Sequence, residues 1–467
     1  MHLGPRVTLA QFCAALDDDA LSVDASVDAR LRATRRIVDA AAAGEAPVYG
    51  LNTGLGANLG HRIAPADIPA FQRQILEGRA VAVGPSLPPR TGRAMLLARL
   101  IGTAQGHSGM SVAMFDHLCA LWRAGVSAPV PRYGSIGAAD LTQNASWAMA
   151  TLEAGAEAGH HAPVLQPKDA MALINHSGLS VALAAEALER ADETLGMLQL
   201  AAALSFEGYG ANADIFDAAL NDLRAAPGQA EMAAWFRAHL APVANPRRVQ
   251  DALSFRVLAP VMGAARDALT RAIAVWEDEL NGASDNPVVL GEEAMRSTPN
   301  FHAPALALAL EQVSLAMALV SSGCAMRVQR LMNPDLTGLP RYLSPVGGAS
   351  AGFVPVQKTV AALAGDVRRH AMPVVFDAAP VSDAVEDVAP MSPLAALKLT
   401  DQAVPLALMA GIEAVVAAQA RDLRGLAPTA LHGALRARVP MLQADRPLGG
   451  DVDAAAEVLR DAARAMV

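Results

Sequence analysis

Four stretches of this chain are apolar on nearly every side over the length of a helix, and a segment of that kind has to be buried. Polar residues such as Arg99, Glu311 and Glu413 interrupt them before the run of about 18 uncharged residues that suggests a membrane span. We therefore expect the long central helices of a bundle and no membrane insertion. Such burial also favours a homo-oligomer, in which other copies cover some helix faces. The stretches cover residues 95–122, 183–204, 305–326 and 404–423.

The composition agrees with a helical fold. Hydrophobic residues make up 53% of the 467-residue chain and aromatic residues only 4%, and its abundant Ala and Leu have high helix propensity. The predicted fold class is all-α. We expect a single unit over 1–467, in which a loop-rich part at 1–200 carries the active site. The central bundle and the C-terminal helices would occupy 201–467.

Charge and cysteine content exclude several classes of function. The net charge is −9, and Lys and Arg never cluster beyond a pair, so a nucleic-acid partner is not expected. Cys13, Cys119 and Cys324 are too far apart for a metal or redox pair, and a reducing cytoplasm suits them. The N-terminus lacks the pattern of a secretory signal peptide. Without a metal or nucleotide motif, we expect no metal ion and no cofactor, and a small-molecule substrate.

Short polar segments interrupt the apolar pattern, and loops on a rigid scaffold commonly carry function. Taken singly, each has a structural explanation: Tyr49 can belong to a turn, and Arg256 can pair with Asp251 or Glu207. The segments are YGLNTGLG (49–56), GSIGAADL (134–141), INHSG (174–178), RRVQDALSFR (247–256), NGASDNP (281–287), NFH (300–302) and VEDVAPM (385–391).

Together and in this order, the segments resemble motifs of the histidine and phenylalanine ammonia-lyase family. YGLNTGLG is similar to its YGxNTGxG, RVQDALSFR to RVQDPYSLR, ELNGASDNP to EINSATDNP, NFH to GNFH, and VEDVAPM to QEDHVSM. The resemblance covers most of the chain. It implies an ammonia-lyase-like, all-helical homotetramer with a long central bundle and active sites built from loops of three subunits.

The segment GSIGAADL departs from the family motif GSVGASGDL, whose Ala, Ser and Gly cyclise into a methylidene-imidazolone electrophile. Here the stretch is one residue shorter, and Ala138 and Ala139 run directly into Asp140. Ser135 cannot replace the missing Ser, because Ile136 follows it where an unhindered Gly is needed. We therefore expect a variant of the family that lacks the electrophile.

Other departures lie on the substrate side of the motifs. Leu253 replaces the family's Tyr, and Arg79 and Val388 each replace a His, which indicates a different substrate. The residues at the family's functional positions that remain are Tyr49, Asn175, Gln250, Arg256, Phe301 and Glu386.

A lyase that retains its base but lacks the electrophile suits a substrate with a better leaving group than ammonia. A quaternary ammonium leaves as a neutral tertiary amine, and the family includes members that act on ergothioneine, a trimethylated thio-histidine. The resemblance implies release of trimethylamine from ergothioneine to leave thiourocanate. Hercynine or another betaine as substrate, and a catalytically inactive homologue, are the alternatives.

The resemblance also implies roles for the site residues. Tyr49 would remove the β-proton, and we expect nearby cations to lower its pKa. Arg256 would hold the substrate carboxylate, with Asn175 and Gln250 positioning it. Arg79 would face the thione sulfur. Glu386 would face the imidazole N–H or the trimethylammonium, Phe301, Phe353 or Tyr133 would offer the cation an aromatic face, and Lys358 is a lesser candidate.

Two of these residues have a competing structural explanation. Arg79 can pair with Glu77 as an ordinary surface or interface arginine. Glu386 can, together with Asp387, cap the helix that is expected to follow.

Overall fold

The computed structural model describes residues 1–240, 248–291, 294–376 and 379–466. Residue 247, the first of the segment 247–256, lies outside them. Helices dominate this part of the chain, and its strands form three two-stranded ribbons. The prediction of an all-α fold is confirmed.

The described residues pack as two compact units, each made of three segments. The first comprises Met1–Glu186, Ile273–Ala309 and Pro373–Leu397, and the second comprises Ala187–Ala272, Leu310–Met372 and Lys398–Val467. The expected single unit with a boundary near residue 200 stays a prediction.

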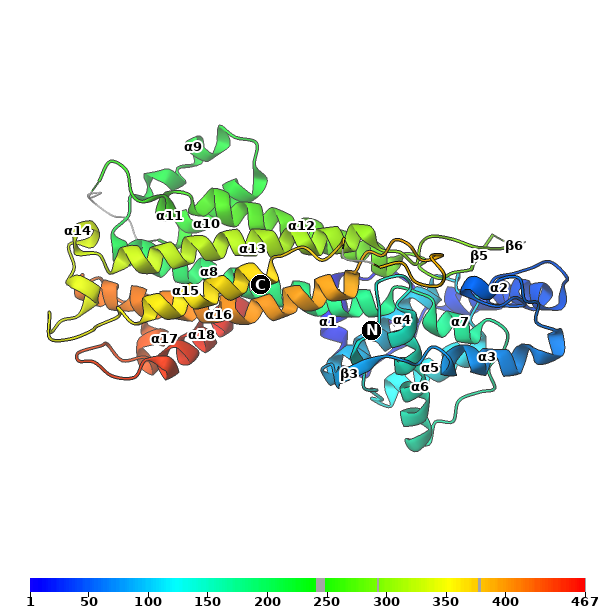
Figure 1. Ribbon diagram of the computed structural model, residues 1–467. Helices are drawn as coiled ribbons and strands as arrows, with labels where there is room; N and C mark the ends of the chain where they lie inside the picture. Colours follow the sequence, from blue (N-terminus) through cyan, green and yellow to red (C-terminus); the bar gives the residue numbers. More distant parts are fainter. Residues whose placement is uncertain (241–247, 292–293, 377–378, 467) are drawn as a thin grey trace. The chain divides into compact units, whose positions relative to one another are not determined.

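Four of the five boundaries between the units lie within long helices, which Figure 1 labels, and the fifth follows Met372 outside a helix. The four helices are α8 (Gly178–Tyr209), α12 (Leu258–Asn281), α13 (Pro304–Leu331) and α16 (Ser392–Leu423). The other elements of the first unit are β1 (His2–Leu3), α1 (Leu9–Ala15), β2 (Ser22–Val23), α2 (Ala25–Ala43), η1 (Gly56–Asn58), η2 (Pro65–Asp67), α3 (Ile68–Glu77), β3 (Val83–Ser86), α4 (Pro89–Ala104), α5 (Val112–Arg123), β4 (Pro131–Tyr133), α6 (Leu141–Glu157), α7 (Asp169–Ile174), β5 (Val288–Leu290) and β6 (Ala294–Arg296). Those of the second are η3 (Ala213–Phe216), α9 (Ala218–Asp222), α10 (Pro227–His239), α11 (Leu253–Arg256), α14 (Pro334–Thr337), η4 (Arg341–Leu343), α15 (Val356–His370), α17 (Ala430–Arg438) and α18 (Gly449–Arg464).

Three of the four apolar stretches form single long helices as expected, because 183–204, 305–326 and 404–423 lie within α8, α13 and α16. The stretch 95–122 is instead divided between α4 and α5, so its prediction as one helix was wrong. Gly106 and Gly109 adopt positive φ between the two helices, a conformation that ends a helix. Ser111 then starts α5, because its side chain accepts a hydrogen bond from the backbone N–H of Met114.

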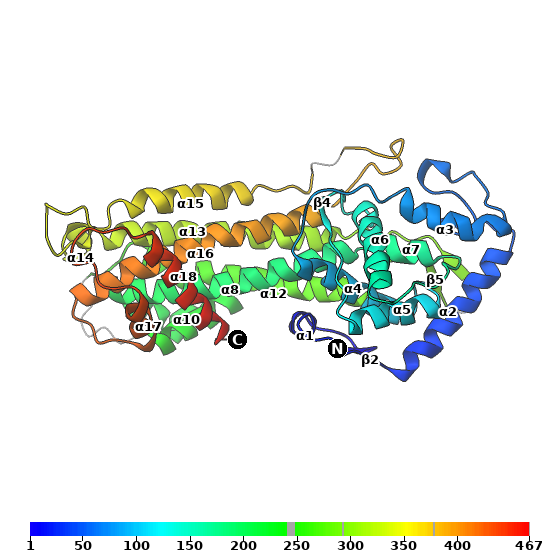
Figure 2. The same cartoon turned by 90° about the horizontal axis from the view of Figure 1, so that it is seen from below.

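In the second unit, polar contacts align three helices that Figures 1 and 2 show side by side: α13, α15 and α16. Arg327 of α13 forms a two-pronged ion pair with Glu413 of α16, at 2.5 and 2.9 Å, and both side chains are buried. Gln402 of α16 bonds Ser314 of α13 and the carbonyl of Val367 in α15. The buried charges of Arg327 and Glu413 thus neutralise each other, and the buried Gln402 amide has hydrogen-bond partners, which offsets the cost of burying polar groups.

In the first unit, the ribbon of β3 and β4 ties two candidate segments together. Val83 of β3 pairs with Tyr133 of β4 in an antiparallel register. The chain that follows Arg79 therefore lies beside the strand that leads into the 134–141 loop. Gly84 has φ +95°, and a Cβ there would lie 2.7 Å from the Tyr133 ring, so this close approach needs a glycine.

Three helical runs are long and apolar enough to cross a membrane, judged only by length and composition within the described residues: Asp169–Tyr209, Pro304–Leu331 and Ser392–Leu423. In the most apolar windows of the first and third, 94% and 89% of residues are buried within the fold, but for Pro304–Leu331 the share is 56%. Helix α13 therefore keeps an exposed apolar face.

Candidate active site

The loop 134–141 is held rigidly by hydrogen bonds. Ala139 and Asp140 both have left-handed backbone conformations, with φ of +64° and +53°, which are uncommon outside glycine. The Ala139 N–H donates to the carbonyl of Phe301 at 3.1 Å, and its carbonyl accepts from the Asn144 side chain at 3.1 Å. The neighbouring contacts thus fix a conformation that the sequence alone would disfavour.

Asp140 fastens this loop to the start of α8. Its carboxylate accepts hydrogen bonds from Ser135 Oγ at 2.5 Å and from the N–H and Oγ of Ser180 at 2.8 and 2.9 Å. Burial raises the pKa of the Asp140 carboxyl, and these hydrogen bonds counteract only part of the effect. Ser180 Oγ also lies 2.8 Å from Ser392 Oγ, at the start of α16.

These residues do not fit the methylidene-imidazolone found in the family that the sequence resembles, in agreement with the expected variant. Cyclisation needs a dehydratable Ser and an unhindered backbone nitrogen, and the positions are taken by Ala138, Ala139 and Asp140. Ser135 is engaged with Asp140 and with the N–H of Gly137. The loop therefore has a structural role.

Tyr49, Arg79 and Glu386 come together in the first unit, although they are far apart in the sequence. Tyr49 is partly buried, and its hydroxyl accepts a hydrogen bond from the Gly56 N–H at 3.5 Å. Burial raises the pKa of Tyr49; the Gly56 N–H and the charge of Arg79 lower it, and Glu386 raises it. A nearby cation, Arg79, lowers this pKa as expected, but the net direction is upward because desolvation outweighs Arg79 in the single chain.

Arg79 is a half-buried guanidinium just after α3. Burial lowers its pKa, while Tyr49 and Glu386 raise it. Glu77, its suggested partner, pairs with Arg73 at 2.7 Å. Within the described part of the chain, the Arg79 side chain makes no ion pair within 4.0 Å and no hydrogen bond. A partly desolvated charge without a partner is typical of a ligand-binding position.

Glu386 is oriented by its own loop. Its carboxylate accepts a hydrogen bond from Ser382 Oγ at 2.9 Å, and its backbone pairs with that of Val381. The suggested capping role is therefore not what this carboxylate does, because α16 begins only at Ser392. Ser382 was missed in the sequence, where only its position four residues before Glu386 in a polar segment marks it.

Three further predicted residues lie in the first unit. Asn175 ends α7 and is 3% exposed, and its side-chain oxygen is buried without a hydrogen-bond partner. Phe301 is partly buried, and its carbonyl holds the 134–141 loop. Tyr133 is exposed on β4. The structure thus ties Phe301 to the altered loop, and the buried Asn175 oxygen has no hydrogen-bond partner among the described residues.

The remaining predicted residues belong to the second unit. Arg256 of α11 donates to Gln250 Oε1 at 3.2 Å, so the proposed carboxylate clamp and its neighbour are together. Lys358 is exposed on α15. Phe353 is only 2% exposed, so in the single chain its ring has no open face for a cation.

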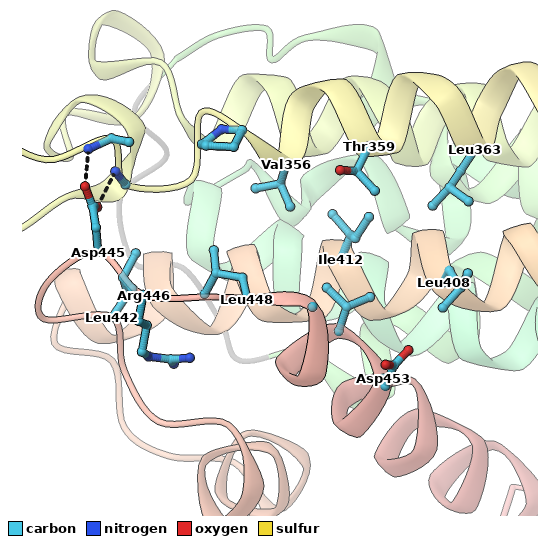
Figure 3. A pocket seen from close by; sticks show the side chains of 15 residues that line it. Val356, Thr359, Leu363, Leu408, Ile412, Leu442, Asp445, Arg446, Leu448 and Asp453 are labelled. Atoms are coloured by element: carbon cyan, nitrogen blue, oxygen red, sulfur yellow. Dashed lines mark hydrogen bonds between the residues drawn. The ribbon is translucent and has the colours of Figure 1, made fainter.

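A separate cavity of about 440 Å³ opens in the second unit between α15, α16 and α18 (Figure 3). Its wall is mostly aliphatic, with Val356, Leu408 and Ile412 among the lining residues. Asp445 at its rim accepts hydrogen bonds from the N–H groups of Ala351 and Gly352. None of the predicted site residues lines this cavity.

The comparisons define the class of this protein as a carbon–nitrogen lyase, a class in which a helical fold of this kind is found. The chain matches the model of the aromatic amino acid lyase family over residues 7–441 and belongs to that family. It is 35% identical to the histidine ammonia-lyase of Paracidovorax citrulli, with 97% of this chain and 94% of the relative covered. It is 37% identical to that of Sorangium cellulosum, with 95% and 93% covered.

Solved structures show the same fold. The chain is similar to the ergothionase of Treponema denticola, with a TM-score of 0.94, 26% identity and 99% of both chains covered. It is also similar to the histidine ammonia-lyase of Trypanosoma cruzi, with a TM-score of 0.89, 27% identity, and 99% of this chain and 94% of that chain covered.

Proposed function

We propose that this protein is a lyase that eliminates trimethylamine from a trimethylated amino-acid betaine, with ergothioneine as substrate and thiourocanate as product. One observation carries the proposal. The loop that makes the family's electrophile lacks the residues for it, while a partly buried Tyr49 remains beside Arg79, a guanidinium that makes no ion pair within the described part of the chain.

The chemistry of the leaving group supports this pairing. A primary amine departs poorly and needs activation, whereas a quaternary ammonium already carries a full positive charge. It leaves as a neutral tertiary amine when the β-proton is removed, so the reaction needs a base and no electrophile. Tyr49 is the proposed base, and deprotonating an ordinary tyrosine at pH 7 costs about 4 kcal/mol. Burial adds to that cost, and the substrate's own cation would offset it.

The remaining roles are proposed from motif positions and from the observed contacts. Arg256, supported by Gln250, would hold the substrate carboxylate, and the free side-chain oxygen of Asn175 would help to orient the substrate. Arg79 would face the thione sulfur, and Glu386 would face the trimethylammonium.

The names of the relatives point to two substrates. The Treponema denticola protein is described as an ergothioneine-degrading enzyme and was solved with desmethyl-ergothioneine sulfonic acid. The curated relatives are histidine ammonia-lyases. The altered 134–141 loop favours the first, because the family's reaction on a primary amine relies on the electrophile that Ala138 and Ala139 cannot form.

We further propose a cytoplasmic homotetramer whose active sites combine loops of different subunits. Helix α13 leaves an apolar stripe open along one face, which a second copy would bury. Leu253 on α11 is also exposed, next to the Arg256 clamp. All three cysteines are buried and form no disulfide among the described residues, as suits a reducing compartment. The stripe consists of Leu308, Leu315, Leu319 and Met326.

The experiment that tests the reaction uses purified protein with ergothioneine, hercynine and histidine in separate assays. Trimethylamine release and the absorbance of the conjugated acrylate product are both followed, and Tyr49→Phe serves as the inactive reference. Turnover of ergothioneine alone supports the proposal. Turnover of hercynine alone supports elimination of a quaternary amine but contradicts the proposed role of Arg79 at the thione sulfur. Deamination of histidine refutes the proposal.

A further inference from the structure

The loop that presents Glu386 has an unusual backbone. Ser382, Asp383 and Ala384 are consecutive non-glycine residues with φ of +55°, +55° and +62°. Each such residue costs roughly 1–2 kcal/mol relative to a right-handed conformation. The loop is closed by the backbone pairing of Val381 with Glu386 and by the bond from the Val385 N–H to the Ser382 carbonyl at 3.1 Å. A conformation this costly needs a compensating interaction.

Ser382 supplies contacts on two sides. Its hydroxyl donates to Glu386 Oε1 at 2.9 Å. It also lies against the turn that carries Tyr49, because a Cβ on Gly56 would be 3.9 Å from Ser382 Oγ. The Gly56 N–H in turn donates to the Tyr49 hydroxyl. Ser382 therefore links the acid to the turn that holds the candidate base.

The opposite charges of Arg79 and Glu386 influence each other but do not pair. Each contributes to the electrostatics of Tyr49, and Glu386 acts on Arg79. No ion pair within 4.0 Å joins them in the described structure. Two partly buried opposite charges that act on each other would ordinarily gain by forming a charge-assisted hydrogen bond. The Ser382 hydroxyl occupies one oxygen of the carboxylate instead.

We propose that Ser382 is a positioning residue: it holds the Glu386 carboxylate away from Arg79, so that both charges stay open to a zwitterionic substrate. The inference rests on the proposed betaine lyase function. A collapsed Arg79–Glu386 pair would neutralise both binding charges, the anion for the trimethylammonium and the cation for the electron-rich end of the ring. The left-handed loop fixes the Ser382 hydroxyl in the direction that prevents the collapse.

A matched pair of glycine variants tests this proposal. Ser382→Gly removes the hydroxyl and also relieves the left-handed strain, so its effect cannot be attributed to a destabilised loop. Asp383→Gly relieves the same strain at the same φ and leaves the hydroxyl in place. We expect kcat/KM for ergothioneine to fall about tenfold in Ser382→Gly, the size expected for losing a hydrogen bond to a charged group, and to stay unchanged in Asp383→Gly.

A conservative variant and a binding measurement separate positioning from folding. Ser382→Asn tolerates positive φ and keeps a donor, so it should restore most of the lost activity. Ergothioneine binding is measured by calorimetry in the Tyr49→Phe background, in which turnover does not interfere. There, Ser382→Gly should raise Kd by a similar factor of about ten. Equal activity and binding in Ser382→Gly and the unaltered protein would overturn the proposal.

A crystal structure of the Ser382→Gly protein tests the inference without any substrate. We expect an ion pair between Glu386 and Arg79 within 4.0 Å. A carboxylate that keeps its original position would contradict the inference, whatever the assays show. If the unaltered protein turns over none of the three substrates, the proposed function fails, and the crystal structure still decides whether Ser382 keeps the two charges apart.

Discussion

Burial of the Lys168 ammonium costs folding free energy, so replacing this residue by an apolar one should stabilise the protein. Its side chain is fully buried, and its ammonium has no hydrogen-bond partner within the described structure. Burial lowers the pKa of Lys168 to about 8; Asp285 and Asp169 raise it and Arg99 lowers it further. Asp285 already has a buried ion pair with Arg99 at 3.1 Å. Asp169 accepts hydrogen bonds from the N–H and Oγ of Ser111 and from the N–H of Gln166. Removing Lys168 therefore leaves neither carboxylate without a partner.

The size of the effect follows from the pKa. At about 1.36 kcal/mol per pKa unit, the change in the pKa of Lys168 from its ordinary value of 10.5 to about 8 corresponds to about 3 kcal/mol. Below pH 8 the lysine is protonated in both the folded and the unfolded state, and the folded state bears this cost. Between pH 8 and 10.5 the unfolded state binds more protons, so the unfolding free energy rises with pH. Lys168→Met should therefore gain up to about 3 kcal/mol at pH 7, and its advantage should shrink above pH 8.

Urea unfolding of Lys168→Met and of the unaltered protein, at pH values from 7 to 10, measures this difference, because the other titrating groups are common to both proteins. Lys168→Arg is the matched control: its charge persists over the whole range, so it should be no more stable than the unaltered protein at pH 7. A Lys168→Met protein that is less stable at pH 7, or whose advantage does not change with pH, would refute the argument.

Three further predictions concern the site and the bundle. Because burial raises the pKa of Tyr49 and the base must be deprotonated, kcat/KM should rise about tenfold per pH unit between pH 7 and 9; a plateau below pH 8 would exclude Tyr49 as base. Arg79→Met should reduce kcat/KM for ergothioneine by at least tenfold and spare hercynine, and equal losses in parallel assays would refute sulfur recognition. Glu413→Ala should cost about 3–5 kcal/mol in urea unfolding because it strands the buried Arg327, and the double variant with Arg327→Met should recover most of the loss.

The long helices could be predicted from the sequence because burial on all sides leaves a local pattern. The prediction of one helix over 95–122 failed because Gly106 and Gly109 lie inside an apolar run, whose hydrophobic pattern gives no sign of a helix end. Their left-handed conformations depend on neighbours that are distant in the chain: a Cβ on Gly109 would lie 2.7 Å from Val38. A periodicity argument does not include such contacts.

Motif positions assigned Tyr49, Arg79 and Glu386 to one site, and the structure brings them together in the first unit. The motif positions did not predict the direction of the pKa shift of Tyr49. The direction of the Tyr49 pKa depends on how much solvent its surroundings remove, which a motif does not encode. The pairing of Glu77 could have been foreseen, because residues four apart on a helix face each other and residues two apart do not. That rule assigns Glu77 to Arg73, as observed, and not to Arg79.

The altered loop and the raised pKa of Tyr49 have a common explanation in the proposed reaction. In the single chain, desolvation outweighs Arg79, so the chain does not by itself lower the pKa of its base. A betaine brings a permanent positive charge into the site, and an opposite charge nearby favours the tyrosinate. The same charge makes the amine a good leaving group without an electrophile. A betaine substrate thus supplies both the positive charge that favours the tyrosinate and a leaving group that needs no electrophile. This requires that Glu386 does not pair with Arg79 and can receive the cation.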